Sequence, residues 1–509
     1  MAIWGVSLFY FLLAIKLNAQ IPDSLDAKRF DGNNIGMWVW NNGWLARDTT
    51  KVAKNQWESG LEWPIDSAKY MVHLSGLWLS AFGDKNFRVA IPDLFISHYL
   101  PGPIDKNGPK NPIDPKYRVY KITRHDLYQP GEDYLQWPVD LGAPLDSTGR
   151  PFLPGNQTLW TVFNDANPET RNGSLFSTNP LSAEIRCMVF DLNGPGLENV
   201  VFCQFEVVNK SPTPWDSLFI SMNAFIELGF VDDNLGATDT TLMAVYAYNA
   251  TDMDNHFGYG KAPPAVGYIL LRQQIGDQIL PRRFFSTFIA NSIMGNVRLV
   301  QPGSPRDIYL LVRGIAFPWQ EIPIFDPTTG ERTLLMFTGD PVLGSGWLDS
   351  YLLDDRAFWA TTGPYQLAPS ETIRISYAIC IARGESNLDS IVRLRETLQA
   401  ALTAFQNLDI PTGIHAAVKA TPKYFELLPN YPNPFFNRTI IKWRQKRHAL
   451  VVIKLYDING KLVRILRNGT YSPGQHFVEF ATEDLSSGLY FCVLQSSEYS
   501  EKIKMIKLK

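Results

Sequence analysis

Residues 200–218 read VVFCQFEVVNKSPTPWDSL, an apolar run, then a polar corner, then the start of a second apolar run. Residues 200–208 are rich in valine and phenylalanine, which favour a buried strand. Residues 209–214 bring Asn, Lys, Ser and two prolines, which belong in a turn, and apolar residues resume at Trp215. A strand, a polar corner and a second strand in direct succession are typical of an antiparallel β-sandwich.

Runs of the same kind lie on both sides of this segment, each apolar or alternating and bounded by turn residues. They predict strands over residues 183–191, 217–225, 241–249, 265–271, 308–315 and 372–382. Residues 20–165 are instead loop-rich and unusually aromatic, with short strand-like segments such as 74–82 and 87–91. We therefore predict a mainly β, multi-domain protein, with an aromatic, loop-rich β region over residues 20–165 and an antiparallel β-sandwich region over residues 166–408.

One long helix is predicted at the end of the sandwich region, over residues 387–407. Its apolar residues recur at steps of three and four, at Leu388, Ile391, Leu394, Leu398, Leu402 and Phe405. Ser386 or Asn387 suits the cap, and Pro411 follows the end. We expect this apolar stripe to dock on the sandwich. Residues 409–424 have no clear periodicity and are predicted to be a linker to a last domain over residues 425–509.

The charge of the chain excludes two classes of partner. It has 47 basic and 50 acidic residues among 509, a formal net charge of −3. Nucleic acid attracts a basic field, and an anionic membrane surface attracts polybasic runs, so neither is expected to bind. The 45% of hydrophobic residues supply a sizeable core, and the length predicts two or more domains.

Residues 1–19 are predicted to be a signal peptide. An apolar run from Ile3 to Ile15 precedes Leu17-Asn18-Ala19, whose small last residue suits signal peptidase. No Lys or Arg precedes the run, so a retained hydrophobic anchor is the alternative. The run is shorter than the ~20 residues that span a bilayer, which favours cleavage.

The four cysteines are too few for a disulfide framework in a chain of this length. Cys187 and Cys203 fall on two predicted strands joined by the turn-rich residues 193–196. They can face each other across a hairpin if the register allows it, because a slip of one residue turns a side chain to the other face. The alternative is two separate buried thiols.

Ordered landmarks run through residues 427–509. They include the motif Asn430, Tyr431, Pro432, Asn433, Pro434 and Phe435, then Gly460, Gly488, Tyr490 and, in a basic tail, Lys507. Alternating apolar residues on both sides of Asn459-Gly460 describe a hairpin within a small immunoglobulin-like sandwich. Phe436, which directly follows the Asn430–Phe435 motif, is an extra aromatic residue that alters one turn.

These landmarks closely resemble the type A C-terminal sorting domain of the type IX secretion system, found in Bacteroidetes and neighbouring phyla. The resemblance implies passage through the periplasm and recognition by the type IX secretion machinery at the outer membrane. It also implies release, or attachment at the cell surface, including attachment to a cell-surface polysaccharide. We therefore expect a secreted or cell-surface protein.

Five further segments stand out in the middle of the chain: Ser75–Trp78, Tyr117–Ile122, Asn156–Trp160, Asn164–Ala166 and Ala262–Tyr268. In these segments the chain is similar to uncharacterised exported proteins that carry the same sorting domain. That resemblance implies no activity.

The densest polar cluster suggests a structural calcium site. Its carboxylates are Asp232, Asp233, Asp239, Asp252 and Asp254, interspersed with Asn234, Asn249 and Asn255. Calcium takes ~6–8 oxygen ligands in irregular geometry, which such residues supply. The alternative is that these residues occupy turns, where Asp and Asn bond their own backbone. No other cofactor is expected, because no His pair, phosphate loop, paired-Cys motif or serine-hydrolase elbow is present.

Two functions remain open. The first is a non-enzymatic structural or adhesive surface protein, since no catalytic constellation is evident. The second is a carbohydrate-binding or carbohydrate-active exoprotein, because the tryptophans of the first third can stack on sugar rings. A glycosidase needs two carboxylates about 5–10 Å apart. The carboxylates near strands are Glu184, Glu206, Glu227 and Asp232, and nothing in the sequence pairs them.

Overall fold

The computed structural model describes residues 24–49, 59–92, 97–254, 258–289, 292–294, 297–299, 302–316, 322–350, 356–411, 425–428, 430–458, 461–482, 484–496 and 499–508. The predicted signal peptide lies outside these ranges, as does most of the predicted linker. The chain divides into two compact units: Met1–Pro144 with Pro151–Pro411, and Leu145–Arg150 with Thr412–Lys509. Among the described residues, no helix combines the length and the apolar character needed to span a bilayer.

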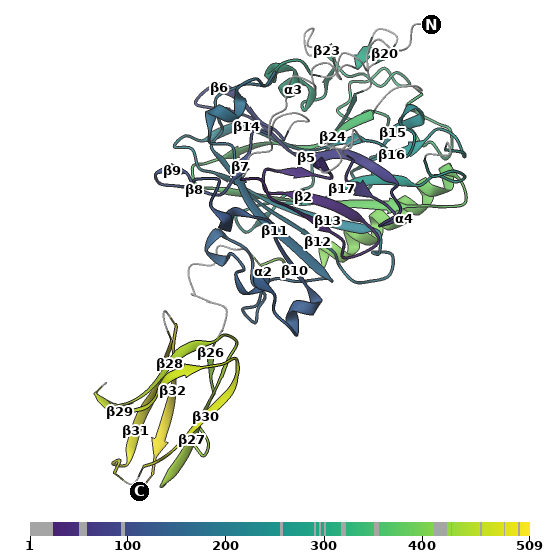
Figure 1. The fold of residues 1–509 in the computed structure, drawn as a ribbon. Coiled ribbons are helices and arrows are strands. Elements are labelled where there is room, and N and C mark those ends of the chain that lie inside the picture. The colour runs from purple at the N-terminus through teal and green to yellow at the C-terminus, as the bar shows by residue number, and fades with distance from the viewer. Residues whose placement is uncertain are drawn as a thin grey trace. The chain divides into compact units, whose positions relative to one another are not determined.

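The larger unit contains two large antiparallel sheets (Figure 1). The first has nine strands, in the order β1 (Ala27–Phe30), β2 (Gly36–Trp40), β3 (Trp44–Leu45), β5 (Tyr70–Gly83), β14 (Trp215–Ile226), β24 (Arg356–Leu367) and β19 (Phe285–Ile289), with β4 (Leu61–Glu62) and β6 (Asn86–Ala90) pairing on β5. The second has ten, in the order β10 (Tyr120–Thr123), β11 (Gln157–Asn164), β12 (Ala183–Phe190), β13 (Val200–Asn209), β25 (Thr372–Ala382), β17 (Ala265–Ile275), β16 (Ala244–Asn249) and β15 (Asn234–Asp239), with β7 (Leu100–Pro101) on β11 and β18 (Gln278–Ile279) on β17.

The two sheets share one hydrophobic core. A single cluster of buried side chains takes Ile220 and Met222 from the first sheet and Phe205 and Ile375 from the second. This packing confirms the mainly β, antiparallel sandwich predicted from the sequence.

The polar corner after residue 209 joins the sheets. β13 belongs to the second sheet and β14 to the first, so residues 210–214 carry the chain between them. Asn209 is buried at the corner, and its side-chain amide donates to the carbonyls of Thr213 and Leu367. Its Oδ1 accepts the backbone N–H of Ser211 at 2.9 Å. The Asn that ends the apolar run therefore organises the change of sheet.

Each large sheet contains strands from both the early and the late part of the chain. β5 pairs with β14 in the first sheet, and β11 pairs with β12 in the second. Residues 20–165 and 166–408 therefore contribute to the same two sheets.

The predicted long helix is confirmed as α4 (Asn387–Gln406). The Ser386 side chain caps it by accepting the N–H of Asp389 at 3.0 Å. Ile391, Leu394 and Leu398 are fully buried where α4 contacts β25, β17 and β16 of the second sheet (Figure 1). The stripe docks on the sandwich as expected.

The strand predicted over residues 308–315 is wrong. Residues Pro305–Leu311 form helix α3 instead. Ser304 accepts the N–H of Asp307 from the cap position, and Pro305 occupies the first turn. Ser followed by Pro is a helix start, and it outweighs the apolar character of the residues that follow.

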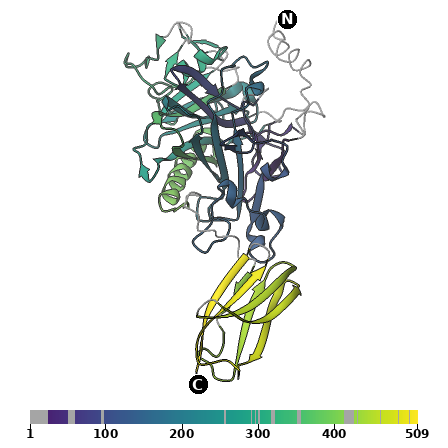
Figure 2. The same ribbon diagram turned by 90° about the vertical axis from the view of Figure 1, so that its left-hand side faces the viewer.

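The smaller unit is a sandwich of two antiparallel sheets (Figure 2). One contains β26 (Phe425–Leu427), β27 (Arg438–Gln445) and β30 (Gly474–Ala481), and the other contains β29 (Leu462–Tyr471), β28 (Ala449–Asp457), β31 (Gly488–Ser496) and β32 (Tyr499–Lys507). Its core includes Trp443 and also Val451, Ile453 and Leu455, which alternate inward along β28 as the sequence predicts. Val463 and Ile465 on the returning strand β29 are 38% and 50% exposed, so the inward alternation predicted for that strand is wrong.

Cys187 and Cys203 are free, buried thiols. On the adjacent strands β12 and β13, Cys187 lies opposite Phe205 and Cys203 lies opposite Val189. The two cysteines are therefore two positions out of register, and the alternative of separate buried thiols holds.

A buried ion pair joins several segments of the larger unit. Asp165 Oδ2 accepts from Arg171 Nη2 at 2.7 Å, and these side chains are 0% and 2% exposed. Arg171 also donates to the carbonyl of His98 at 3.1 Å. His98 is fully buried, and its Nε2 lies 3.1 Å from Ser174 Oγ. Burial, with the nearby Arg171 charge, lowers the pKa of His98 to about 3.

This neutral histidine is expected to make the protein less stable in mild acid. The unfolded chain takes up the proton near pH 6.5, whereas folded His98 takes it up only near pH 3. The His98 contribution is therefore present above pH 6.5 and decreases by up to about 1.4 kcal/mol per pH unit as the pH falls toward 3. Urea unfolding of the wild type and of His98→Gln at pH 7.5, 5.5 and 4.5 measures it. Parallel pH profiles for the two proteins would contradict this expectation.

Candidate functional site

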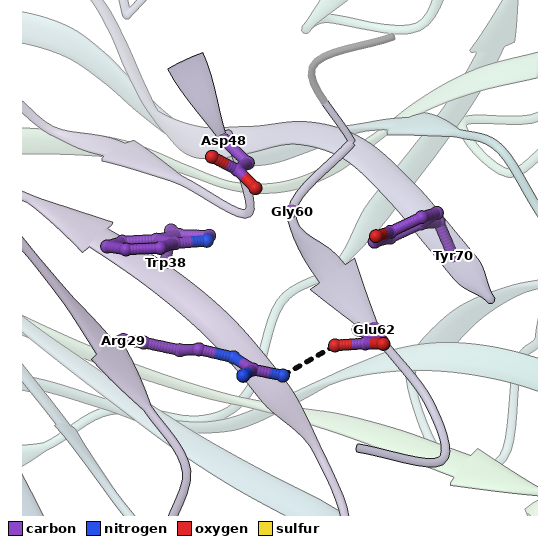
Figure 3. Close-up of a pocket in the computed structure, with 6 residues that line it drawn as sticks. All are labelled: Arg29, Trp38, Asp48, Gly60, Glu62 and Tyr70. Atoms are coloured by element: carbon purple, nitrogen blue, oxygen red, sulfur yellow. Dashed lines mark hydrogen bonds and ion pairs between the residues drawn. The ribbon is translucent and has the colours of Figure 1, made fainter. Parts of the chain in front are cut away.

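A small polar pocket opens on the first sheet of the larger unit (Figure 3). Its volume is about 220 Å³, and it is lined by Arg29, Trp38, Asp48, Gly60, Glu62 and Tyr70. These residues come from β1, β2, the segment after β3, the residues before β4, β4 itself and the start of β5. Figure 3 shows the side chains arranged around a common space.

Gly60 allows two backbone segments to meet at this pocket. A Cβ atom at position 60 would lie 2.8 Å from the backbone nitrogen of Asp48 and 2.8 Å from the carbonyl carbon of Arg47. The Gly60 N–H donates to the carbonyl of Ala46 at 2.8 Å. Glycine is therefore required for the segment before β4 to lie against the segment that carries Asp48.

Ion pairs fix the position of Arg29 at the edge of the pocket. Its Nη2 lies 2.5 Å from Glu62 Oε2, and its Nη1 lies 2.9 Å from Asp66 Oδ1. Burial, with the nearby carboxylates of Glu62 and Asp48, raises the pKa of Tyr70.

The predicted calcium ligands divide between the two ends of the hairpin formed by β15 and β16. Asn234 lies opposite Asn249, and Asp239 lies opposite Ala244. Asp239 is therefore about 17 Å along the strand from the end that carries Asp233. There it accepts the N–H groups of Thr241 and Leu242.

The remaining carboxylates of this cluster bond to neighbouring loops. Asp233 accepts from the side-chain amide of Asn249 at 2.6 Å, and Asp252 accepts the N–H of Asn387 at 3.0 Å. Asp254 is buried and accepts the N–H groups of Tyr259 and Phe230. Burial raises the pKa of Asp233 to about 6, against the bond from Asn249.

No group of three or more His, Cys, Asp or Glu within the described ranges is placed to hold a metal ion. Asn255 and the side chain of Asp232 lie outside the described part of the chain. The calcium site stays a prediction.

Of the carboxylates near strands named from the sequence, Glu184 and Glu206 are engaged in ion pairs with arginines, Glu227 lies beside a histidine, and the side chain of Asp232 lies outside the described residues. Glu206 lies 2.7 Å from Arg374 Nε and 3.3 Å from Arg186 Nη1. Glu184 lies 2.9 Å from Arg186 Nη2 and accepts the N–H of Ile104. Glu227 lies 3.5 Å from His73 Nδ1. Each contact fixes neighbouring strands or loops of the sandwich.

Most tryptophans of the first third belong to the core. Six of them are buried, namely Trp40, Trp44, Trp63, Trp78, Trp137 and Trp160. Trp57 lies outside the described residues, and Trp38 is half-buried in the wall of the pocket. Among the tryptophans of this region that the structure describes, Trp38 is therefore the one left to form the predicted stacking surface.

The sorting motif joins the start of the smaller unit to its last strand. Asn433 accepts the N–H of Ile506 at 2.9 Å and donates to the carbonyl of Lys504 at 3.0 Å. Phe435 is fully buried and exchanges two backbone hydrogen bonds with residues 506 and 508. Asn430 is buried and donates to Thr439 Oγ1.

The other sorting residues occupy different environments. Tyr431 is 77% exposed, whereas Tyr490 and Lys507 are buried. The Tyr490 hydroxyl donates to the carbonyl of Ser486, and Gly488, the first residue of β31, adopts a φ of +154°. Gly460 lies outside the described residues. Pro432 accepts from Thr439 Oγ1 at 2.9 Å.

The pocket was not predicted, apart from its tryptophan. Arg29, Asp48, Glu62 and Tyr70 carry no spacing or motif that links them.

Comparisons with known proteins identify the end of the chain. Residues 430–508 match the family described as the secretion system C-terminal sorting domain. This confirms the predicted sorting domain, so the protein is exported, to the medium or to the cell surface. The domain implies interaction with the secretion machinery.

Comparison with curated proteins finds no relative. One solved structure, a polysaccharide lyase, aligns at 10% identity over 64% of this chain and 34% of its own, with a TM-score of 0.19. The chain spans about a third of that enzyme. A likeness of this size supports no shared architecture or activity.

Proposed function

We propose that the protein is a non-enzymatic surface protein of structural or adhesive type. Its larger unit is a rigid sandwich that carries the binding surface, and its smaller unit directs export. The observation that carries the proposal is that two buried carboxylates on the strands are paired with arginines. Glu184 and Glu206 share Arg186, and Glu206 also pairs with Arg374.

This network supports a structural role for these carboxylates. A general acid needs a raised pKa, and a nucleophile needs access to the reacting bond. Glu184 is 1% exposed and Glu206 is 6% exposed, and arginine side chains occupy the positions next to both carboxylates. Carboxylates buried and paired in this way support strand pairing and have no access to a substrate bond.

The second candidate function is carbohydrate binding. One observation favours it: Trp38 lines a pocket whose other walls are polar. An indole beside hydrogen-bonding side chains suits a ligand with one apolar and one polar face.

Incubation of the exported protein with a panel of polysaccharides and extracellular proteins tests the proposal. We expect retention on one or more of them without new reducing ends or new amino termini. Heat-unfolded protein is the control for nonspecific retention. Product formation that the unfolded protein does not give would overturn the non-enzymatic proposal. Retention on a polysaccharide alone would favour the second candidate.

A further inference from the structure

Charge is divided unevenly between the end of the chain and the rest. Residues 425–509 contain 13 Lys and Arg and 7 Asp and Glu, a formal net charge of +6. Because the whole chain has a net charge of −3, the preceding residues together carry −9. The smaller unit by itself therefore has the positive field that the whole chain lacks.

Three lysines of the smaller unit lie on one face of the sheet formed by β29, β28, β31 and β32 (Figure 1). Lys454 and Lys502 both lie opposite Val493 of β31, and Lys504 lies opposite Phe491. Side chains paired in this way point to the same side of a sheet. The core residues that alternate with them are Ile453, Leu455, Cys492, Leu494 and Met505. The three ammonium groups therefore share the outer face, which points away from the core.

Within the described part of the smaller unit, no carboxylate forms an ion pair with these three lysines, whereas three arginines each have one. The Lys454 ammonium donates to the neutral Oε1 of Gln495 at 2.9 Å. Glu501 of β32 accepts a backbone N–H of β26 instead. Glu483 and Glu498 lie outside the described residues, and the net charge of +6 already counts them. The outer face is therefore positive.

Apolar side chains surround the lysines on this outer face. The pairs across the strands are Ile465 with Lys454, Leu462 with Tyr456, and Ile506 with Leu489. Ile465, Leu462 and Ile506 are 50%, 45% and 37% exposed. Four strands of nine or ten residues make a face of about 14 Å by about 30 Å. A continuous apolar face of this size marks an interaction surface.

The composition of the outer face favours a lipid surface over a protein partner. Protein–protein interfaces are enriched in arginine and depleted in lysine, whereas all three cations here are lysines. The apolar stem of a lysine lies along apolar surface while its ammonium reaches the phosphates of anionic lipids. The rings of Tyr456 and Phe491 between aliphatic side chains suit the boundary between headgroups and acyl chains.

We propose that the smaller unit docks on an anionic phospholipid surface through this outer face. The three lysines contact lipid phosphates, and Leu462 and Ile465 enter the headgroup region. The attachment is peripheral and reversible, because it uses only the side chains of one sheet face. This inference goes beyond the proposed function, which concerns the larger unit.

Flotation of the protein with lipid vesicles tests the proposal. The protein begins at Gln20, because the apolar run of the predicted signal peptide would itself bind lipid. One set of vesicles contains phosphatidylcholine, and the other contains phosphatidylcholine and phosphatidylglycerol. We expect at least tenfold tighter binding to the anionic vesicles at about 0.1 M salt, and weaker binding at about 1 M.

Two pairs of lysines separate this face from charge in general. Lys502→Gln with Lys504→Gln removes two charges from the outer face and is expected to weaken binding at least tenfold. Lys442→Gln with Lys446→Gln removes two exposed charges on β27 and directly after it, in the other sheet of the same unit. We expect this control to change binding less than threefold.

A second pair of variants tests the apolar part of the face. Leu462→Ser with Ile465→Ser keeps the charge and is expected to weaken binding at least threefold. Phe477→Ser is the control, because Phe477 is 65% exposed on the other sheet. Thermal melting shows whether each variant is folded, and the comparison of the two vesicles on the wild type does not depend on the variants.

Equal binding to the two kinds of vesicle would overturn the proposal, as would an equal loss in the two lysine pairs. No binding to either vesicle would also overturn it and would leave the face to a protein partner. None of these results bears on polymer retention or turnover, so failure of this proposal is distinguishable from failure of the proposed function.

Discussion

Replacement of Asp165 by asparagine is expected to lower the free energy of unfolding by about 3–5 kcal/mol, because it leaves a buried arginine without its counter-charge. Asp165 is 0% exposed, and Arg171 is 3% exposed. Besides the 2.7 Å contact with Arg171, the carboxylate accepts the N–H groups of Leu181 at 2.8 Å and Ala183 at 2.6 Å. Asparagine keeps one carbonyl oxygen and carries an NH2 group in place of the other, and the NH2 group cannot accept a hydrogen bond. The variant therefore loses a hydrogen bond from the backbone as well as the charge.

A double-mutant cycle isolates the interaction energy between Asp165 and Arg171 from the effects of their other contacts. Arg171→Met removes the charge and keeps much of the apolar stem, so the double variant Asp165→Asn with Arg171→Met is expected to cost less than the sum of the single changes. Chemical unfolding monitored by tryptophan fluorescence measures all four proteins.

An exposed ion pair provides the matched control. Asp105 pairs with Lys110 at the surface, where the two side chains are 33% and 43% exposed. Asp105→Asn is expected to leave stability almost unchanged, because solvent screens such pairs. If Asp165→Asn proved as mild as Asp105→Asn, the buried pair would not have the structural role assigned here.

Local patterns in the sequence predict individual strands and helices, but they do not predict which strands pair. The apolar run over residues 200–208 and the polar corner after it correspond to β13 and the connection to β14. One neighbour of β14 in the sheet is β5, more than 130 residues earlier in the chain, and the other is β24, more than 130 residues later. Pairing between such distant strands depends on the packing of the whole sandwich, and no local signal specifies it.

The pocket is harder to predict for the same reason. β3 and β4, which bring Asp48 and Glu62 to it, are two residues long each. A periodicity needs four or more residues to be detected. The sorting domain, by contrast, is readily predicted from the sequence, because its landmarks are dense and follow one another in order. In the structure Asn433 and Phe435 bond directly to the last strand.

Gly155→Ala is expected to destabilise the larger unit by about 3 kcal/mol or more, because the new methyl group has no space. A Cβ atom at position 155 would lie 2.1 Å from the carbonyl oxygen of Asp191 and 2.5 Å from its carbonyl carbon. These are backbone atoms at the end of β12, so a side-chain rotation cannot relieve the contact.

The region around Gly155 cannot move away without losing hydrogen bonds. Asp191 Oδ1 accepts the N–H groups of Asn156 and Gln157, both at 2.8 Å, and Oδ2 accepts from the Asn156 amide at 2.9 Å. Asp191 is 1% exposed, so a displaced carboxylate would remain buried without these donors. Either response to the added methyl group, overlap or displacement, costs stability.

Gly83→Ala is the matched control for this change. The nearest atoms to a Cβ at position 83 lie 3.5 Å away, which is an ordinary contact, and Gly83 ends a strand as Gly155 precedes one. We expect Gly83→Ala to unfold within about 1 kcal/mol of the wild type. Chemical unfolding of both variants measures the difference. Equal stabilities would mean that the segment before β11 relaxes freely, and that the close approach of Gly155 to Asp191 does not hold β11 and β12 together.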